Sequence, residues 1–318
     1  MKALFTVDYG EERFQKIRDL GIEVAFYDEF GTKSKDFQLP PEYLDADFMV
    51  CFNPFPQIDL KQFSRLKWIQ LVSVGFNHVP KEQIQTMNIL LTNNVGTTRI
   101  PIAEWVVTQI LQSYKQARTF TRQQQAKVWK VQKDILELYG KSVTFLGAGN
   151  IAQETARKLK SFDVNTCALR HSEKPVEFMD RVFSISEIDQ ILPESDIVIC
   201  TLPATQDTFH LLNRERLGLM KDNSVLVNIS RGSVIEELAL IDLLVQGKFR
   251  AVALDVFEKE PLAADSPFWS IERVFITPHN AIFSDQSDER VYEMVYSNIK
   301  NYTNDCMPCN IVDFELGY

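Results

Sequence analysis

A glycine-rich turn in the middle of the chain constrains the fold more than any other feature. An apolar run at residues 143–146 leads into Gly147-Ala148-Gly149-Asn150-Ile151-Ala152, and a helical pattern follows at 153–162. The first glycine permits a tight strand-to-helix turn, the second lets the backbone approach a pyrophosphate, and Ala152 leaves room for the helix to pack. A second apolar run at 164–169 completes a βαβ unit, the context this motif requires. The turn therefore predicts a dinucleotide-binding site.

Length and composition favour a folded protein with two domains. The chain has 318 residues, more than the roughly 250 to 300 at which one hydrophobic core stops growing. Hydrophobic residues make up 45% and charged residues 24%, so disorder is not expected. A net charge of −9 offers no basic surface for nucleic acid or an anionic membrane. No apolar run approaches 18 residues and no basic leader precedes an apolar segment, so we expect a cytoplasmic protein.

Short apolar runs alternate with helical patterns, which predicts an α/β fold. In the first part, strand-like runs cover residues 2–7, 23–27, 48–52, 68–72 and 89–92, with a helical pattern at 11–20. In the second part, strand-like runs cover residues 142–146, 164–169, 196–202, 224–229, 251–256 and 274–277. Six strands with helical connections favour one doubly wound parallel sheet there.

Two longer helical patterns flank the second set of strands. The first covers residues 101–125 without a turn signal, so we expect one continuous helix between the domains. The second covers residues 284–302 and carries apolar residues along one side. Its simplest role is to return the chain to the first domain and cover it.

The five cysteines do not predict a disulfide framework. Their number is odd, and Cys51, Cys167 and Cys200 lie in strand-like runs, where a free thiol behaves as a small apolar side chain. Cys306 and Cys309 have the spacing of a redox or metal-binding pair. Neither a second pair nor a nearby histidine accompanies them, so an ordinary surface pair is favoured and their role stays open.

Several motifs follow one another in an order that is typical of one family. Those of the second part are the glycine turn at 147–152, Leu202-Pro203-Ala204-Thr205-Gln206-Asp207-Thr208, Val227-Asn228-Ile229-Ser230-Arg231-Gly232, Asp255-Val256-Phe257-Glu258-Lys259-Glu260-Pro261-Leu262 and Thr277-Pro278-His279-Asn280. Those of the first part are Ser73-Val74-Gly75-Phe76-Asn77 and Ala103-Glu104-Trp105. Together they resemble the D-isomer-specific 2-hydroxyacid dehydrogenases.

This resemblance implies a domain organisation and a set of binding residues. A flavodoxin-like substrate domain, residues 1–97 and 283–318, is expected to hold an inserted Rossmann-type dinucleotide domain, residues 98–282, each built on a doubly wound parallel sheet. The implied substrate contacts are Val74, Gly75, Arg231 and His279. The implied cofactor contacts are Gly147, Gly149, Asn150, Ile151, Leu202, Pro203, Thr208, Ile229 and Asp255.

Reduction of a 2-keto acid needs a cation for the carboxylate and an acid for the forming alkoxide. Arg231 follows the strand at 224–229, where its forked N–H donors can hold a carboxylate; the alternative is a surface ion pair. His279 follows the strand at 274–277, and imidazole exchanges protons readily near neutrality. Glu260 can supply the carboxylate that orients His279 and stabilises its cationic form. The alternative for a lone histidine is a structural role, and the family resemblance carries most of the weight against it.

Two further expectations concern the role of Asp255 and the use of a metal ion. Asp255 leaves the strand at 251–256 and can accept from the nicotinamide amide, but an aspartate at such a place equally often caps a turn. We expect no catalytic metal, because neither a histidine pair nor an aspartate cluster has ligand spacing.

The end of the second strand of the βαβ unit predicts the cofactor. An NAD site usually has an acidic residue there, which accepts from the ribose hydroxyls. This chain has Arg170, followed by His171 and Ser172, which together form a cradle suited to a 2′-phosphate. We therefore expect NADP(H) to be favoured, with NAD(H) possible. The alternative is an exposed basic turn that accepts either cofactor.

The motifs together predict an NAD(P)-dependent oxidoreductase that interconverts a small 2-keto acid, such as glyoxylate or hydroxypyruvate, and its 2-hydroxy acid. A 3-phosphoglycerate dehydrogenase matches the motifs equally well. A dinucleotide-sensing binding protein without turnover is the alternative from another class. The resemblance and the apolar content of residues 105–129 also predict a homodimer.

Overall fold

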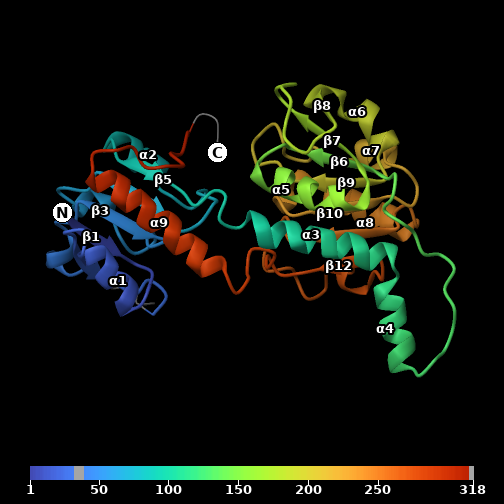
Figure 1. Cartoon of the computed structure of the whole chain (residues 1–318), viewed down its shortest axis with the longest axis horizontal. Helices are drawn as coiled ribbons and strands as arrows, with labels where there is room; N and C mark the ends of the chain where they lie inside the picture. The colour runs from blue at the N-terminus through green and yellow to red at the C-terminus, as the bar shows by residue number, and fades with distance from the viewer. Residues whose placement is uncertain (32–38, 315–318) are drawn as a thin grey trace. The chain divides into compact units, whose positions relative to one another are not determined.

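The chain forms two compact units. The computed structural model describes residues 1–31 and 39–314. One unit comprises Met1–Thr97 and Asp285–Tyr318, and the other comprises Thr98–Ser284. The first unit is therefore built from both ends of the chain, whereas the second is one continuous segment (Figure 1).

The first unit contains a parallel sheet whose described strands have the order β2-β1-β3-β4-β5. The strands are β1 (Lys2–Phe5), β2 (Glu23–Phe26), β3 (Phe48–Cys51), β4 (Trp68–Leu71) and β5 (Leu90–Thr92). This is the order of flavodoxin-like sheets, in which the winding direction changes between β1 and β3. Every strand lies within a run that the sequence predicts.

Alternate residues of these strands build two hydrophobic cores, because successive side chains of a strand point to opposite faces. One face, which includes Phe5 and Trp68, packs against α1 (Glu11–Arg18) and α9 (Ser287–Thr303). The other face, which includes Met49 and Ile69, packs against α2 (Lys81–Thr86). α9 thus returns from the far end of the chain to cover the first unit, as the sequence predicts.

A chain of buried polar side chains joins α9 to the first sheet. Asn298 on α9 donates from Nδ2 to Gln70 Oε1 at 2.7 Å, and Gln70 Oε1 also accepts from Thr92 Oγ1 at 2.8 Å. Thr92 Oγ1 in turn accepts from Trp68 Nε1 at 2.8 Å. Buried polar groups are costly unless they are paired, so this network fixes the position of α9 along the sheet.

The second unit contains a seven-stranded parallel sheet, all of it within the described residues, in the order β12-β11-β10-β9-β6-β7-β8. The strands are β6 (Ser142–Leu146), β7 (Asn165–Arg170), β8 (Arg181–Ser184), β9 (Ile197–Cys200), β10 (Val225–Asn228), β11 (Ala251–Leu254) and β12 (Val274–Ile276). This is the Rossmann order with one added strand, and the winding changes direction between β6 and β9. The prediction of two doubly wound parallel sheets is confirmed.

Helices cover both faces of the second sheet. α3 (Arg99–Tyr114) and α5 (Asn150–Leu159) pack on one face. α6 (Ile188–Ile191), α7 (Arg214–Leu219) and α8 (Glu237–Val245) pack on the other. Burial on both faces explains why β9, β10 and β11 are almost continuously apolar in sequence. Among the described residues, no helix combines the length and the apolar character needed to cross a membrane.

The expected single helix over residues 101–125 is wrong. The structure has two helices, because α3 ends at Tyr114 and α4 spans Ala117–Gln125. Between them, Gln116 adopts a left-handed φ of 57°, which a continuous right-handed helix does not contain. The carbonyl of Tyr114 accepts from the amide of Leu136 at 3.0 Å. A contact with a residue distant in sequence therefore accompanies the break.

The sequence patterns also missed the strand β8 and the helix α2. β8 is an edge strand of four residues, and each of them is at least partly exposed. α2 has six residues and buries only Ile84. Elements this short and this exposed carry too little hydrophobic periodicity to be recognised.

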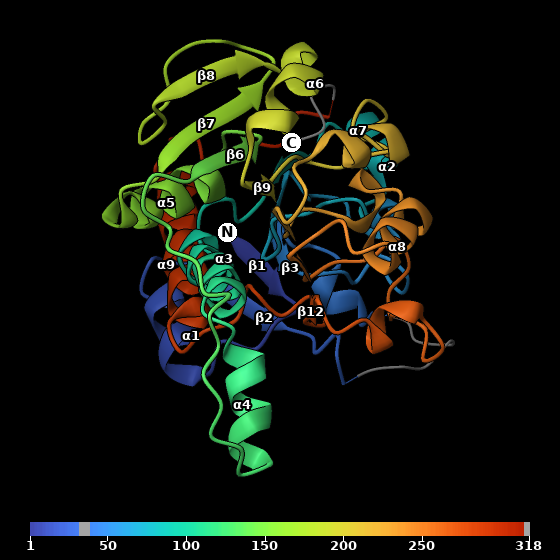
Figure 2. The same cartoon turned by 90° about the vertical axis from the view of Figure 1, so that its right-hand side faces the viewer.

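α4 and the segment that follows it form an arm. α4 buries none of its residues. Figures 1 and 2 show that α4 and the extended chain after it project from the rest of the second unit. This arm, residues 117–135, carries several exposed apolar side chains.

Candidate active site

The motif residues of the second unit lie along one edge of its sheet. The strands run parallel, so their carboxyl ends share an edge, and ligands of doubly wound sheets bind at such an edge near the change in winding direction. The ends of β6, β7, β9, β10, β11 and β12, with the loops that follow them, carry every site residue that the sequence predicts in this unit.

The glycine turn after β6 has a conformation that suits a dinucleotide. Gly147 has a φ of +100°, and a Cβ there would lie 2.8 Å from Thr201 Oγ1. A Cβ on Gly149 would meet nothing within 4 Å, so the backbone borders open space that a pyrophosphate can enter. α5 begins directly afterwards, and the amides of Asn150 and Ile151 belong to its first turn, where N–H groups lack acceptors within the helix. The residues present therefore fit a dinucleotide.

Arg170, His171 and Ser172 lie where β7 ends, next to the strand that carries the glycine turn. Ser172 Oγ accepts from the amide of Lys174 at 3.4 Å. Within residues 1–31 and 39–314, no carboxylate forms an ion pair with Arg170. The Arg170 guanidinium is thus available to an added anion.

The loop after β9 lies beside the glycine turn. Thr208 Oγ1 donates to the carbonyl of Pro203 at 2.7 Å and closes this loop. A Cβ on Gly147 would lie 3.3 Å from the amide nitrogen of Leu202, so the two loops are in direct contact. Ile229 follows β10 and is almost fully buried. The structure therefore brings together the residues predicted to contact the cofactor from β6 and β9.

Arg231 is a largely buried cation with unused donors. Asn228 shapes its turn, because Asn228 Nδ2 donates to the Arg231 carbonyl at 3.0 Å and Oδ1 accepts from Ser230 Oγ at 2.8 Å. The guanidinium donates to the carbonyl of Ser230 at 2.7 Å and has no ion pair with a carboxylate of the described residues. Burial lowers the pKa of Arg231, and the nearby charge of Glu260 opposes this shift. An anionic ligand would supply the missing counter-charge.

Gly232 packs directly against the backbone that follows β11. A Cβ at this position would lie 1.8 Å from the carbonyl carbon of Phe257 and 2.1 Å from the amide nitrogen of Glu258. Only glycine permits such an approach. This contact joins the turn that carries Arg231 to the loop that leads to Glu260.

His279 and Glu260 form a hydrogen-bonded pair. His279 Nδ1 lies 3.0 Å from Glu260 Oε2, and Glu260 Oε1 accepts from the amide of Phe257 at 3.0 Å. His279 has a left-handed φ of 52°, and its amide donates to the carbonyl of Asp255 at 2.7 Å. The side chain of His279 is 42% exposed. When Nδ1 donates to Glu260, Nε2 is left to exchange a proton with a ligand.

Asp255 caps the turn that carries His279. It is 2% exposed, and its carboxylate accepts from Thr277 Oγ1 and from the amides of Asn280 and Ala281. The sequence left two roles open for Asp255, contact with the nicotinamide amide and capping of a turn. These hydrogen bonds are those of a turn cap. Contact with a nicotinamide amide stays a prediction.

Val74 and Gly75 lie in the first unit, in the loop after β4. Asn93 Nδ2 donates to the carbonyl of Val74 at 2.9 Å, and Ser73 Oγ donates to the carbonyl of Gly75 at 2.8 Å. No acceptor in the described part of the chain pairs with the amides of Val74 and Gly75. Both carbonyls accept a side-chain hydrogen bond, and the two amides stay open to solvent or to an anion, so substrate contact by this loop stays a prediction.

Two asparagines that shape these loops were not predicted from the sequence. Asn228 lies in the segment 227–232, and an asparagine that leaves a strand commonly bonds the backbone beyond it. Asn93 follows β5 and holds a loop that is distant in sequence. The position of Asn228 at the end of a predicted strand was a usable signal. Nothing in the local sequence indicates that Asn93 bonds the carbonyl of Val74.

Comparison with known proteins decides the family. The family model described as "D-isomer specific 2-hydroxyacid dehydrogenase, NAD binding domain" matches residues 107–281, more than half of the chain. The chain belongs to the D-isomer-specific 2-hydroxyacid dehydrogenases. This confirms the resemblance seen in the motifs, and it makes the chain an oxidoreductase with a nicotinamide dinucleotide cofactor.

Individual members of the 2-hydroxyacid dehydrogenase family match over most of the chain. A glyoxylate reductase of Thermofilum pendens is 32% identical, with 89% of this chain and 88% of the relative covered. A D-3-phosphoglycerate dehydrogenase of Methanocaldococcus jannaschii is 27% identical over 98% of this chain, which spans only 59% of that relative. The structure of a D-isomer specific 2-hydroxyacid dehydrogenase family protein from Aeromonas salmonicida has a TM-score of 0.84 at 25% identity, with 98% of this chain and 99% of that chain covered.

We expect Gly232→Ala to damage both stability and activity. The added methyl group forces the backbone at Phe257 to move, which typically costs about 1–3 kcal/mol in unfolding free energy and displaces Glu260 from Arg231. Gly218→Ala on α7 is the matched control, because a Cβ there meets nothing within 4 Å. Urea unfolding and kcat/KM measure both variants. Equal behaviour of the two would contradict the importance of this contact.

Proposed function

We propose that the protein reduces a small 2-keto acid, such as glyoxylate or hydroxypyruvate, to the 2-hydroxy acid with NADPH. The observation that carries this proposal is the largely buried Arg231, which has no carboxylate partner among residues 1–31 and 39–314 and lies on the same sheet edge as the His279–Glu260 pair. A cation and a proton donor beside a dinucleotide turn are the groups that this reduction needs.

Arg231 holds the substrate in the proposed reaction. Its guanidinium can grip a carboxylate and a keto oxygen through parallel N–H donors, and low exposure strengthens this charge-assisted contact. Val74 and Gly75, in the first unit, stay predicted substrate contacts. We accordingly propose residues 1–97 and 283–318 as the substrate domain and 98–282 as the dinucleotide domain.

His279 supplies the proton. As negative charge develops on the keto oxygen, the imidazolium gives up its Nε2 proton to it. Glu260 fixes the ring through Nδ1 and stabilises the charged imidazole before transfer. The nicotinamide, when bound, supplies the hydride. The pyrophosphate of the dinucleotide would be held by the glycine turn, at Gly147, Gly149, Asn150 and Ile151. The proposed further cofactor contacts, in the loops after β9 and β10, are Leu202, Pro203, Thr208 and Ile229.

The name of the Thermofilum pendens relative supports glyoxylate as a substrate. A D-3-phosphoglycerate dehydrogenase is the second candidate, because the relative with that name is similar over 98% of this chain. A binding protein without turnover has no need of Arg231, Glu260 and His279 together. Following cofactor absorbance with a panel of 2-keto acids tests the proposal, and no turnover on any of them would refute it. A cytoplasmic location stays a prediction from composition.

We expect His279→Ala to lower kcat by roughly 10² to 10⁴, with little change in cofactor affinity, because it removes the proton donor and no cofactor contact. His210→Ala is the matched control, since His210 Nε2 also pairs with a carboxylate, Glu258 Oε1, at 2.8 Å. Steady-state kinetics and cofactor titration measure both variants. A His279→Ala enzyme with wild-type kcat would remove His279 from the chemistry.

We expect NADPH to be preferred over NADH, and Arg170→Asp to reverse the preference. The substitution removes a charge-assisted contact with the 2′-phosphate, so kcat/KM for NADPH should fall by about tenfold or more. Arg181→Asp makes the same charge change at the opposite end of the neighbouring strand and should preserve the preference. Equal kcat/KM for both cofactors in the unmutated protein would refute the phosphate cradle.

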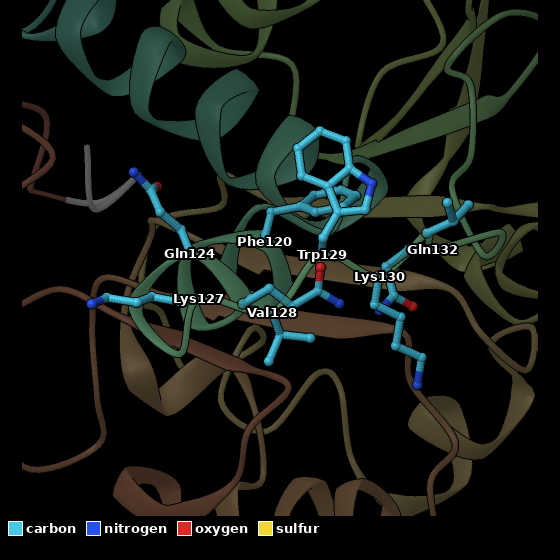
Figure 3. Close-up of a pocket in the computed structure, with 9 residues that line it drawn as sticks. Phe120, Gln124, Lys127, Val128, Trp129, Lys130 and Gln132 are labelled. Atoms are coloured by element: carbon cyan, nitrogen blue, oxygen red, sulfur yellow. The ribbon is translucent and has the colours of Figure 1, made fainter.

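The arm supports a homodimer. Trp129 is 100% exposed, and Phe120, Val128 and Val131 are also exposed. Phe120, Val128 and Trp129 are among the residues that line a hollow of about 650 Å³. Figure 3 shows these three side chains, at α4 and in the segment that follows it. Exposed apolar surface of this kind usually marks an interface, and a second copy of the chain offers the same surface by symmetry.

Trp129→Asp should weaken this dimer. Sedimentation at micromolar concentration is expected to show a dimer for the unmutated protein and a shift to monomer for the variant, because a charge would have to be buried. Leu238→Asp, at an exposed apolar position on α8, controls for the added charge. A monomer in the unmutated protein would refute the proposal.

A further inference from the structure

A polar cavity of about 280 Å³ lies at the amino edge of the second sheet. Its lining includes Arg250 and Ala251, where β11 begins, and Arg273, directly before β12. The end of α3 and the start of α4 also line it. Because the strands are parallel, this edge is opposite the carboxyl edge that carries Arg231 and His279. The cavity is therefore separate from the candidate active site.

Arg118 is a partly buried cation in this cavity. Its guanidinium carbon lies 3.8 Å from the ring centroid of Phe275, and Nη1 donates to the carbonyls of Glu272 and Val274 at 3.1 and 2.6 Å. Within residues 1–31 and 39–314, Nε and Nη2 have no acceptor and no carboxylate forms an ion pair with this side chain. Burial lowers the pKa of Arg118, the charge of Arg122 lowers it further, and that of Glu272 opposes both. The free edge, Nε and Nη2, can bind an oxyanion through two parallel hydrogen bonds.

Arg250 and Arg273 also line the cavity. The side chain of Arg250 is 9% exposed, and its Nη1 and Nη2 donate to Asp134. Its Nε is buried and has no hydrogen-bond partner in the part of the chain that the structure describes. Arg273 Nη1 donates to the carbonyls of Gly247 and Phe249 at 3.1 and 3.0 Å. Of the three arginines, only Arg250 has a carboxylate partner among the described residues.

The two acidic residues of the lining are already paired. Asp134 Oδ1 lies 3.1 Å from Nη1 of Arg250, and Glu272 forms an ion pair with Arg122. Ser113 Oγ, on α3, is buried and lacks a hydrogen-bond partner in the described ranges of the chain. Buried polar groups are nearly always paired in folded proteins. The cavity therefore combines unpaired polar groups with an excess of positive charge.

We propose that this cavity binds a small dianion of the phosphate class, either inorganic phosphate or a phosphate monoester. The Nε and Nη2 donors of Arg118 bind two of its oxygens, and the other two arginines add positive charge. A phosphate monoester has a charge of about −1.5 to −2 at pH 7, which matches the two arginines without a carboxylate partner. The cavity is slightly smaller than the roughly 300–1,000 Å³ of pockets for drug-sized ligands, so the ligand has few carbon atoms.

The arm of a second copy of the chain is a poorer occupant. The segment after α4, residues 126–133, carries Lys127, Lys130 and Lys133 and no acidic residue. Like charges brought together across an interface are repulsive, so this segment would be disfavoured among three arginines. The charges of the cavity favour a small anion.

Both ends of the arm meet at the cavity. Arg118, near the start of the arm, bonds the main chain at β12, and Asp134, near its end, bonds Arg250 before β11. A ligand that binds only this folded arrangement stabilises it by mass action. Bound phosphate therefore holds the base of the arm against the sheet.

Isothermal titration calorimetry of the full-length protein with inorganic phosphate tests the site, with NADPH present to occupy the dinucleotide site. We expect one phosphate per chain, and Arg118→Gln should weaken its affinity at least about tenfold, because two charge-assisted hydrogen bonds are lost. Arg214→Gln, at an exposed arginine that pairs with Asp242 on the same unit, is the matched control. Arg231→Gln should also retain the affinity. No binding, or loss only in Arg231→Gln, would overturn the proposal.

Chemical labelling locates the site in the unmutated protein, so it does not depend on the folding of a variant. Phenylglyoxal modifies accessible arginines, and peptide mass spectrometry measures the extent at each one. Inorganic phosphate should slow the modification of Arg118 severalfold and leave that of Arg214 unchanged. Equal modification of Arg118 with and without phosphate would show that the ion binds elsewhere.

Titration with glycerol 3-phosphate separates the two sources of phosphate. Tighter binding than that of inorganic phosphate would identify a phosphate monoester as the ligand, and the reverse order would identify the free ion. Absence of binding by both would overturn the site. None of these measurements requires turnover of a keto acid, so failure of this site and failure of the proposed function are distinguishable.

Discussion

The close approach of two backbone segments holds the candidate site together. Gly232 lies against the main chain at residues 257–258, where no side chain fits. One segment carries Arg231 and the other leads to Glu260. Main-chain packing, rather than two flexible side chains, therefore fixes the position of Arg231 relative to Glu260. Because Glu260 is hydrogen-bonded to His279, the same packing fixes Arg231 relative to His279. Protein interiors are close-packed, so the two backbone segments cannot slide gradually past one another.

Burial of Arg231 at the carboxyl edge of the second sheet lowers the stability of the folded protein, because its charge lacks a counter-charge among the described residues. Arginines elsewhere, such as Arg214 with Asp242 and Arg216 with Asp189, lie near the surface and have carboxylate partners. Arg231 is more buried, and among the described residues it bonds only a carbonyl. Burial of an uncompensated charge is unfavourable, so such a residue persists where a ligand completes it.

The sequence predicted what local patterns encode. β6 has the expected bounds, and the glycine turn follows it because φ at Gly147 and the contact with Thr201 exclude other residues. The break at Gln116 was missed because the segment around Leu136, distant in sequence, bonds the end of α3. The capping role of Asp255 was recognised only as one of two choices. Its partners lie in the turn that follows another strand, β12, and sequence spacing does not reveal which donors a fold brings to a carboxylate.

The first unit is assembled from two stretches of chain that are synthesised far apart in time. Phe5, Phe48 and Trp68 pack against Tyr292, Val295 and Ile299 of α9. Until α9 leaves the ribosome, only α1 covers that face of the sheet, while the continuous segment Thr98–Ser284 already contains everything its own core needs. Domains generally fold as units during synthesis, so the inserted unit can complete its fold first. The unit made from both ends of the chain is then completed last, after the inserted unit has folded.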